Sequence, residues 1–459
     1  MSKAVAMPAE KPQRDYSKRT SLRVLASFMK PYRGKAILAL LLLLSDITGM
    51  LFIPTELSAM VNTAITSTDT AELTSHGIAM LIAAIAGSAG CIASYWVVSR
   101  LAANVARDLR IALYKKSLDL SSGDFERFGT GTMVTRTLSD VNVVQQTILT
   151  TFTMAAPVPV ICVVAVILAW HIDSQMGIML LIVVAVMLAI SAIAVATSAP
   201  TFLVMQGFVD RMNVRLRETI TGMRVIRAFG REERERGRLD DSFDQYAKSA
   251  IRVNMVFSVA DCMTFFLMNV VEVLVIWMGA DRVGAHAMQI GSISALTEYA
   301  ILIMFFMMMA QFALLMMPRA MACLTRAAEV LDTDPQVKDP EKPVALSFAP
   351  SSEVARFDHV SLCFDDADED TLHDISFSIR RGQTCAIIGN TGSGKSTVAR
   401  MLLRFHDVTA GSINFLGRDL RELTQEELRS HIAYVPQKAW LFSGTIAENL
   451  RHGNPSATD

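Results

Sequence analysis

The chain has 459 residues, of which 52% are hydrophobic and only 19% are charged, and its mean hydropathy is +0.37. These values indicate a membrane protein with two or three domains. The net charge of −1 gives no ground for a nucleic-acid partner. The six cysteines are scattered, so they exclude the C-x-x-C and Cys/His clusters typical of zinc or redox sites.

The N-terminal segment, residues 1–35, is polar and carries nine Lys or Arg. It lacks the short apolar core and cleavage site of a secretory signal, so we expect a cytoplasmic start. Within it, Leu22, Leu25 and Phe28 recur near helical spacing beside Lys30. This pattern predicts a helix that lies in the membrane interface before the first span.

Six apolar stretches follow, and each is long enough to cross a bilayer core of about 30 Å. The connections 100–146 and 200–252 carry seven and eleven Lys or Arg, whereas Arg282 is the only basic residue in the short connections. The positive-inside rule therefore predicts that both termini and both long loops lie in the cytoplasm. The expected spans are Ala36–Met60, Ile78–Val98, Ile148–Trp170, Met176–Ala199, Val253–Met278 and Ile293–Met317.

The two long loops keep a helical apolar rhythm, as in Leu109 and Leu113 of the first loop and Val225 and Phe229 of the second. Glycines interrupt this rhythm, among them Gly222. We expect each loop to be a pair of long helices that leave the membrane and meet at a short turn. Separately folded loops are the alternative, but a domain of about 50 residues buries little core.

A membrane domain over 36–318 is thus followed by a polar, proline-punctuated linker over 319–353 and a soluble domain over 354–459. Thr424-Gln425-Glu426-Glu427 is a capping box that predicts a short helix. Short runs of alternating or apolar residues predict strands at Val354–Phe357, Ile375–Ile379, Cys385–Ile388, Gly411–Phe415 and Ile432–Val435.

A glycine loop lies between the predicted strand Cys385–Ile388 and a helical pattern that begins at Thr397, and it reads GNTGSGKS. Its glycines let successive backbone N–H groups point at phosphate oxygens, Lys395 neutralises the β- and γ-phosphates, and the Ser396 hydroxyl is placed to ligate Mg²⁺. A glycine turn without a ligand is the alternative, yet this pattern arises by chance in only roughly 1–2% of such chains. The expected nucleotide-binding residues are Gly389, Asn390, Thr391, Gly392, Ser393, Gly394, Lys395, Ser396 and Thr397.

Charged residues within spans are functional candidates, because burying a charge in a bilayer is costly. Asp261 and Glu272 lie 11 residues apart in the fifth span, so they share one helix face about 16 Å apart. Together with Asp46 of the first span they are candidates for a cavity that favours cationic substrates. Alternatively, Asp261 lies near the cytoplasmic interface and pairs with an arginine. Four grouped methionines suit an adaptable cavity or simple packing: Met304, Met307, Met308 and Met309.

Several further tracts carry a resemblance. The first loop contains Asp124-Phe125 followed by GTMVTR at 131–136, and the second reads RETITGMRVIRAFGRE at 217–232. The last domain contains YVPQ at 434–437 and LFSGTIAENL at 441–450. With the six spans and the phosphate loop, these tracts resemble a half-transporter of the ATP-binding cassette (ABC) exporter family, and the resemblance extends from about residue 20 to 459.

The resemblance implies a polytopic α-helical membrane domain fused to an incomplete α/β P-loop NTPase domain, with ATP and Mg²⁺ as ligands. Gln437 would be the catalytic Q-loop residue that contacts Mg²⁺ and the attacking water. Phe364 stands where the family usually has a tyrosine that stacks on adenine, and a core phenylalanine is the alternative. The implied function is ATP-dependent export of an amphipathic or cationic small molecule by a homodimer or heterodimer in the plasma membrane.

One departure from the family pattern affects the expected activity. The sequence ends at Asp459, before the family's signature motif, Walker B aspartate and catalytic carboxylate could appear. We therefore expect ATP binding, and leave hydrolysis by this chain open. Two other readings stay open: an importer, for example of a siderophore, on the same fold, and a regulatory subunit that binds nucleotide without turnover.

Overall fold

A computed structural model describes residues 18–66, 70–346, 353–364, 367, 369–454 and 456–458. The chain forms two compact units. The described residues of the first lie within Arg14–Lys115 and Val134–Asp332, and those of the second within Lys116–Met133 and Thr333–Asp459. Of the expected N-terminal segment, residues 1–17 lie outside the described residues. Helix α1 begins at Lys18 and contains Leu25, and its place in the membrane interface stays a prediction.

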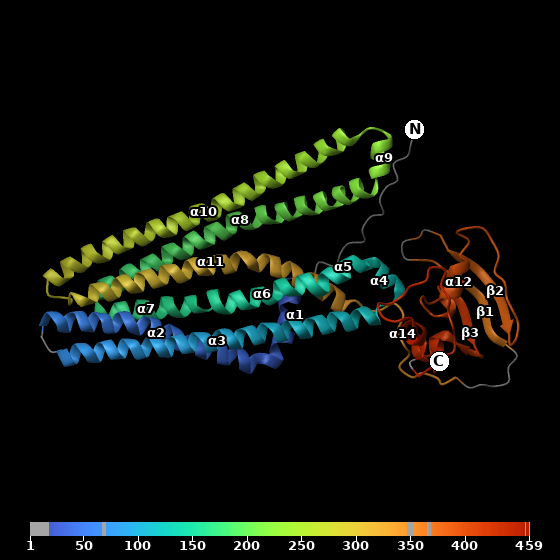
Figure 1. Ribbon diagram of the computed structural model, residues 1–459, viewed down its shortest axis with the longest axis horizontal. Helices are drawn as coiled ribbons and strands as arrows, with labels where there is room; N and C mark the ends of the chain where they lie inside the picture. Colours follow the sequence, from blue (N-terminus) through green and yellow to red (C-terminus); the bar gives the residue numbers. More distant parts are fainter. Residues whose placement is uncertain are drawn as a thin grey trace. The chain divides into compact units, whose positions relative to one another are not determined.

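The first unit is helical (Figure 1). Six helical stretches of the described chain are long and apolar enough to cross a membrane, which confirms the expected number of spans. The third of these is continuous through two π-helical turns, η2 and η3. The elements are α1 (Lys18–Met29), η1 (Lys30–Tyr32), α2 (Arg33–Thr66), α3 (Thr70–Asp119), α5 (Thr130–Thr135), η2 (Arg136–Asp140), α6 (Val141–Thr150), η3 (Thr151–Ala155), α7 (Pro157–Ile172), α8 (Ser174–Thr221), α9 (Met223–Ala228), α10 (Glu232–Gly284) and α11 (Gly291–Asp332).

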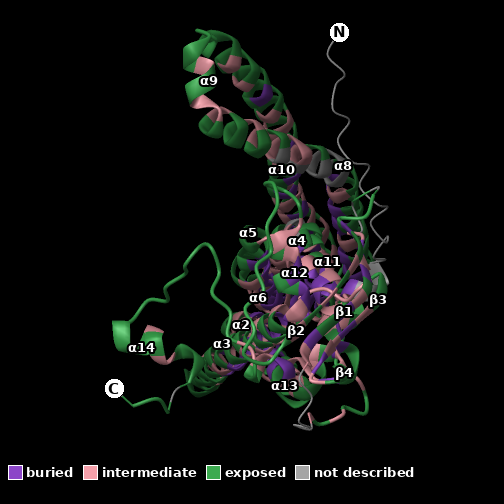
Figure 2. Cartoon of the chain, turned by 90° about the vertical axis from the view of Figure 1, so that its right-hand side faces the viewer, coloured by how far each residue is buried: buried purple, intermediate pink, exposed green. Residues whose placement is uncertain are grey.

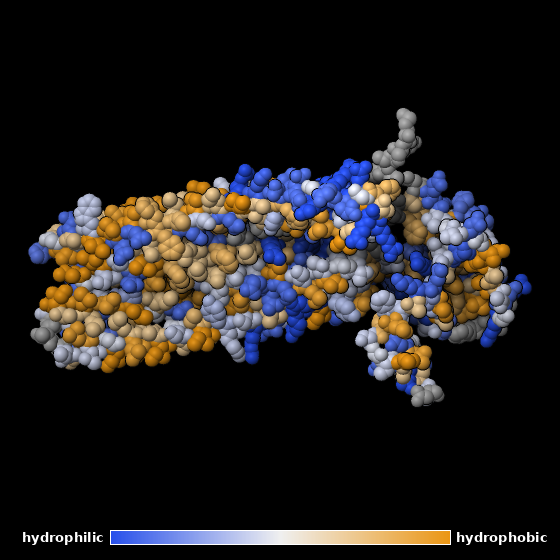
Figure 3. Space-filling view, turned by 45° about the horizontal axis from the view of Figure 1, so that its top comes forward, coloured by the Kyte–Doolittle hydropathy of each residue, from blue (hydrophilic) through white to orange (hydrophobic). Residues whose placement is uncertain are grey.

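The core of this unit is built from α2, α7, α8, α10 and α11, whose apolar side chains pack around buried residues such as Leu180 and Tyr299. The Tyr299 hydroxyl lies 2.6 Å from Thr55 Oγ1, which satisfies a polar group that would otherwise be costly to bury. Many large apolar side chains instead face outward along the spans, and Figure 3 shows them as an extended hydrophobic surface on the helices. Such a surface is expected of helices that contact lipid.

The two long loops are helical, as expected. Helix α3 continues to Asp119, and α8 and α10 extend from the spans to a turn that contains the short helix α9. No residue of α9 is buried, and the exposure around this turn is visible in Figure 2. Phe229, which caps α9, is 75% exposed. The second loop therefore exposes a large apolar side chain to solvent at its turn.

The end of the sixth span differs from the prediction. Helix α11 runs through Pro318 and ends at Asp332, so the expected linker over 319–353 is helical in its first part. Proline removes one backbone hydrogen bond, which costs about 3 kcal/mol within a helix. Burial outweighs this cost, because Cys323 and Leu324 pack against Leu101 and other side chains of α3 and α6. Residues 347–352 of the expected linker lie outside the described residues.

The second unit is built around a four-stranded antiparallel sheet in the order β2-β1-β3-β4. Phe357 of β1 pairs with Phe377 of β2 on one side and Ile413 of β3 on the other, which confirms three expected strands. Thr424 caps the expected short helix α13. The elements are α4 (Ser122–Phe128), β1 (Glu353–Leu362), β2 (Leu372–Arg380), α12 (Lys395–Leu402), β3 (Ala410–Phe415), β4 (Arg418–Asp419), η4 (Leu420–Glu422), α13 (Gln425–Ser430), α14 (Ile446–Leu450) and η5 (Arg451–Gly453).

Two expected strands are not formed. Residues 385–388 and 432–435 are irregular, and Ile388 and Val435 are 91% and 90% exposed. A strand needs a hydrogen-bonded neighbour, and the described sheet offers none to either run because its four strands pair only with one another. The apolar composition of these runs was therefore a misleading signal in this structure.

Candidate nucleotide-binding site

The glycine loop joins the irregular run 385–388 directly to α12. Gly392 and Gly394 have φ of +87° and +80°, a left-handed backbone that other residues rarely adopt. Gly394 is also the N-cap of α12, and a Cβ there would lie 2.5 Å from Leu372 Cδ2. Glycine at 394 is therefore required by both the backbone conformation and the close approach of β2.

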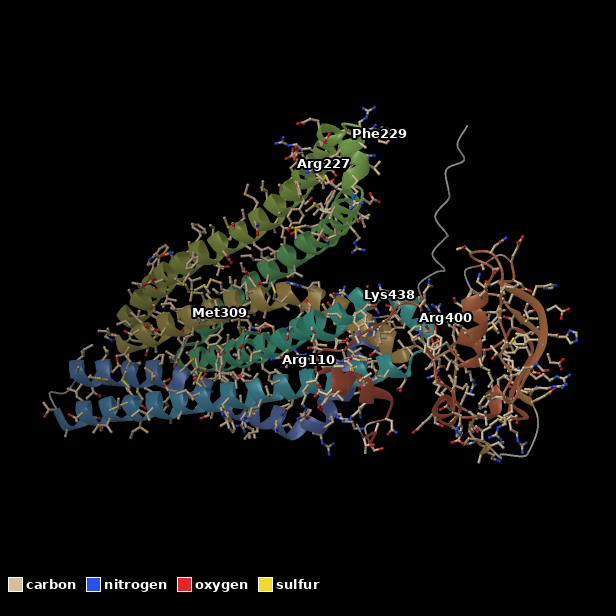
Figure 4. All side chains as sticks on the ribbon, turned by 45° about the vertical axis from the view of Figure 1, so that its right-hand side comes forward. Arg110, Arg227, Phe229, Met309, Arg400 and Lys438 are labelled. Carbon is tan, nitrogen blue, oxygen red and sulfur yellow. The ribbon has the colours of Figure 1, made fainter. Side chains whose placement is uncertain are left out.

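Helix α12 is held in place by its apolar face. Val398 and Met401 are buried and pack in the same cluster as Phe357 and Val360 of the sheet. The opposite face is exposed and carries Arg400, labelled in Figure 4. The packing fixes the N-terminus of α12, whose unpaired N–H groups and partial positive charge attract anions.

Lys395 turns back over the loop. Its Nζ donates to the carbonyl oxygens of Gly389 at 2.9 Å and Asn390 at 2.6 Å, and it lies 3.4 Å from Ser393 Oγ. The ammonium group is thus held by neutral acceptors within the loop. Phosphate oxygens would be stronger acceptors for the same group, because a hydrogen bond between two charged groups is about twice as strong as a neutral one.

The loop residues fit a nucleotide phosphate, since they combine left-handed glycines, a helix N-terminus and an ammonium group. Ser396 is exposed at the start of α12, and the Thr397 N–H donates to the Gly394 carbonyl at 3.0 Å. No cluster of three or more His, Cys, Asp or Glu that could hold a metal exists among the residues described. A magnesium ion here would accordingly need oxygens from the nucleotide and water in addition to Ser396.

Phe364 lies at the end of β1 and is half-buried against the cluster that contains Leu372. Its ring meets His406 edge to face, with centroids 5.1 Å apart. Leu372 in turn approaches Gly394 of the phosphate loop, so Phe364 borders the same core as the loop. The expected stacking on adenine stays a prediction.

Gln437 is exposed within the irregular segment that follows α13. In the part of the chain that the structure describes, its side chain makes no hydrogen bond, and none joins it to the phosphate loop. Its neighbours Val435 and Trp440 are 90% and 75% exposed. No hydrogen bond joins Gln437 to Lys395 among the described residues, and the role in Mg²⁺ and water contact stays a prediction.

The first loop contributes a contact that its sequence motifs do not predict. Asp124 of α4 accepts from the hydroxyl of Ser121 at 2.5 Å and from the backbone N–H of Gln336 at 3.0 Å. A Cβ at Gly123 would touch Gln336 and His406. Helix α4 therefore packs against other segments of the second unit. The pattern Ser121-x-x-Asp124, a capping box, was the available sequence signal.

The three membrane acids occupy different positions in the helical unit. Asp46 of α2 is half-buried and faces the Cys91 thiol of α3. On α10, Asp261 is exposed and Glu272 is half-buried, and neither forms an ion pair within the described part of the chain. Met304 and Met307 of α11 are buried in the helical core, whereas Met309, labelled in Figure 4, is half-buried. The substrate role of these acids stays a prediction.

Comparison with known proteins gives matches over nearly the whole chain. Residues 36–308 match the family model described as the ABC transporter transmembrane region, and residues 372–459 match the one described as ABC transporter. An uncharacterized ABC transporter ATP-binding protein of Mycobacterium tuberculosis is 33% identical over 432 residues, which cover 94% of this chain and 74% of that protein.

Two further matches are informative. A probable multidrug resistance ABC transporter ATP-binding/permease protein of Bacillus subtilis is 34% identical over 249 residues, which cover 54% of this chain and 42% of that one. The solved structure of a bacterial Atm1-family ABC exporter with ATP bound has a TM-score of 0.74 at 20% identity, over 93% of this chain and 75% of that one. This likeness shows that the two chains share a fold.

Proposed function

Since the chain belongs to the ABC transporter family, with a transmembrane region and an ABC ATPase domain in one polypeptide, we propose that it is one half of an ATP-driven exporter that works as a dimer. The observation that carries this proposal is the phosphate loop around Lys395 in a chain whose described residues contain six candidate membrane spans. The partner is a second copy or a related half-transporter.

The phosphate loop binds the nucleotide in this account. The backbone N–H groups of Gly392 and Gly394 and the start of α12 surround the phosphates, and Lys395 exchanges its two carbonyl acceptors for phosphate oxygens. Ser396 and Gln437 would hold Mg²⁺, which neutralises phosphate charge when bound. Phe364 provides a ring on which adenine stacks.

Two short helices transmit nucleotide binding to the spans. Helix α4 is fixed to the nucleotide-binding unit by Asp124, so a movement of that unit is passed to α3, which only two residues separate from α4. Helix α9 joins α8 and α10 and exposes Phe229 and Arg227, labelled in Figure 4, for contact with the partner. Together, these helices would couple dimer closure to a change in cavity access.

The substrate class that we propose is amphipathic or cationic. Asp46, Asp261 and Glu272 supply negative charge within the spans, and the buried Met304 and Met307 lend the helical core adaptable packing. The related protein of Bacillus subtilis described as a probable multidrug resistance transporter supports the same class. We also propose that the protein lies in the plasma membrane. The distribution of Lys and Arg among the loops supports an orientation with both termini in the cytoplasm.

Transport in membrane vesicles tests this function and its direction. Inside-out vesicles should accumulate a cationic amphipathic dye when ATP is added, and Lys395→Ala should abolish this accumulation. Right-side-out vesicles loaded with ATP should instead lose the dye. ATP-driven accumulation in the right-side-out vesicles would contradict export and support the importer reading.

A further inference from the structure

Helices α8 and α10 run side by side in the helical unit (Figure 1). Two open cavities lie between them, one after the other along the pair. The first, of about 490 Å³, lies between the halves of the two spans that contain Met179 and Leu274. The second, of about 640 Å³, lies nearer the extended loop, and Ile193 and Met263 line it. The two cavities therefore occupy successive stretches of the same helix pair.

The two cavities differ in charge. The first has no charged residue in its lining, and its most polar member is Gln175. The second is also lined almost wholly by apolar atoms, but at one end these include the aliphatic stems of Lys248 and Arg252, whose charged groups reach beyond the lining. These two residues are one turn apart on α10, so their side chains extend from the same face. Neither forms an ion pair within the described residues, and both are exposed.

The position of the two cations matches a membrane surface. Arg252 immediately precedes the apolar span that begins at Val253, on the side where the loop 200–252 carries eleven Lys or Arg. From Arg252 to Met263 the helix rises about 16 Å. This is half of a bilayer core of about 30 Å, so the cavity has the depth of one leaflet.

We propose that this cavity holds one anionic phospholipid of the cytoplasmic leaflet, with its phosphate between Lys248 and Arg252 and an acyl chain along Ile193, Val259 and Met263. Charge complementarity selects this occupant. A cationic molecule would be repelled by the two basic groups, and an apolar helix of a second chain would offer them no opposite charge. The first cavity lacks the basic end and has no preference for an anionic lipid.

Native mass spectrometry of the full chain tests the site. The chain is purified from a membrane mixture that contains equal amounts of phosphatidylglycerol and phosphatidylcholine with identical acyl chains. The wild type should retain one phosphatidylglycerol per chain in preference to phosphatidylcholine. Lys248→Gln with Arg252→Gln should reduce this preference roughly 25-fold, because each basic side chain near the surface contributes about fivefold. Arg231→Gln with Arg234→Gln removes the same charge elsewhere on the same loop and should leave the preference unchanged.

A second variant separates a lost site from a misfolded chain. Val259→Trp fills the apolar part and leaves both cations in place, so it should reduce retention of phosphatidylglycerol while the purified chain keeps its wild-type helical circular dichroism. Equal retention of the two lipids by the wild type would overturn the proposal. An unchanged preference for phosphatidylglycerol in the double glutamine variant would also overturn it. The same holds if the double glutamine variant retains phosphatidylglycerol but changes from dimer to monomer, because the cavity would then hold a second chain.

Discussion

Arg326 donates one hydrogen bond to each carboxylate oxygen of Asp140, with Nε to Oδ2 and Nη2 to Oδ1 both at 2.7 Å. The side chain of Asp140 is only 6% exposed, whereas that of Arg326 is 44% exposed. One turn away along each element, Arg136 pairs with Glu329 at 2.9 Å. The two ion pairs tie η2 of the first loop to the end of α11, so these two elements must move together.

Asp140→Asn should destabilise the helical unit. The change leaves Arg326 with a neutral partner, and we expect a loss of about 1–2 kcal/mol, less than the ~3–5 kcal/mol of a fully buried pair because Arg326 is partly solvated. Thermal unfolding in detergent measures the loss. Glu233→Gln breaks the exposed pair with Arg236 and serves as the matched control, with a change within about 0.5 kcal/mol. Equal melting temperatures for Asp140→Asn and the control would show that the ion pair between Asp140 and Arg326 does not stabilise the helical unit.

Gly394→Ala should abolish nucleotide binding, and a second substitution that removes the resulting steric clash should restore part of it. The added Cβ enters a left-handed backbone, which costs roughly 1–2 kcal/mol, and it collides with Leu372. Gly392→Ala has the same backbone problem with open space around the Cβ, so it should impair binding less. Adding Leu372→Ala to Gly394→Ala should partly restore binding of a fluorescent ATP analogue. No recovery in the double variant would show that the close approach is not the cause.

The pKa of His359 should depend on Asp374. The Nδ1 of His359 lies 2.6 Å from Asp374 Oδ1, and this hydrogen bond raises the pKa of the imidazole above its ordinary value of 6.5. The interaction therefore stabilises the fold below about pH 6.5 and is lost as the pH rises through the raised value. In Asp374→Asn the titration of His359, followed by NMR with labelled histidine, should move to lower pH. An unchanged titration midpoint of His359 in Asp374→Asn would show that Asp374 does not raise its pKa. The NMR signal that disappears in His359→Gln is that of His359.

Phe229→Ala should uncouple transport from nucleotide binding. The ring is exposed on the turn between α8 and α10, so its removal should leave folding and ATP binding unchanged. ATP-driven dye accumulation in inside-out vesicles should fall at least about fivefold if the ring contacts the partner's nucleotide domain. Phe243→Ala, which removes an exposed ring from α10, is the control. Wild-type transport by Phe229→Ala would place the coupling contact elsewhere.

Local patterns predicted most of the architecture. The spans follow from hydrophobic length alone, and the phosphate loop follows from glycine and lysine spacing, because both signals lie within a short stretch. The sequence places Pro318 at the end of the membrane domain and predicts a linker from residue 319, whereas α11 continues to Asp332 because Cys323 and Leu324 are buried against distant helices. The apolar run ending at Ile388 was misread as a strand because pairing partners are not encoded in the run itself.

Long-range contacts lay beyond sequence reasoning. Asp140 and Arg326 are 186 residues apart, and no spacing rule relates them. Lys248 and Arg252 counted only as part of a basic loop until the structure placed them at the end of an apolar cavity. Charge and hydrophobicity are readable from the sequence, whereas the surfaces that bring them together depend on how α8 and α10 pack.

Binding of a fluorescent ATP analogue with Mg²⁺ to the purified full chain, measured by anisotropy, tests the central claim most directly. The wild type should bind saturably, and Lys395→Ala should weaken binding roughly 10- to 100-fold, because it removes a charged hydrogen-bond donor from the phosphates. Lys342→Ala removes an exposed lysine of the same unit and should bind like the wild type. If Lys395→Ala binds as tightly as the wild type, the loop from Gly389 to Ser396 is not the nucleotide site and the proposed exporter mechanism fails.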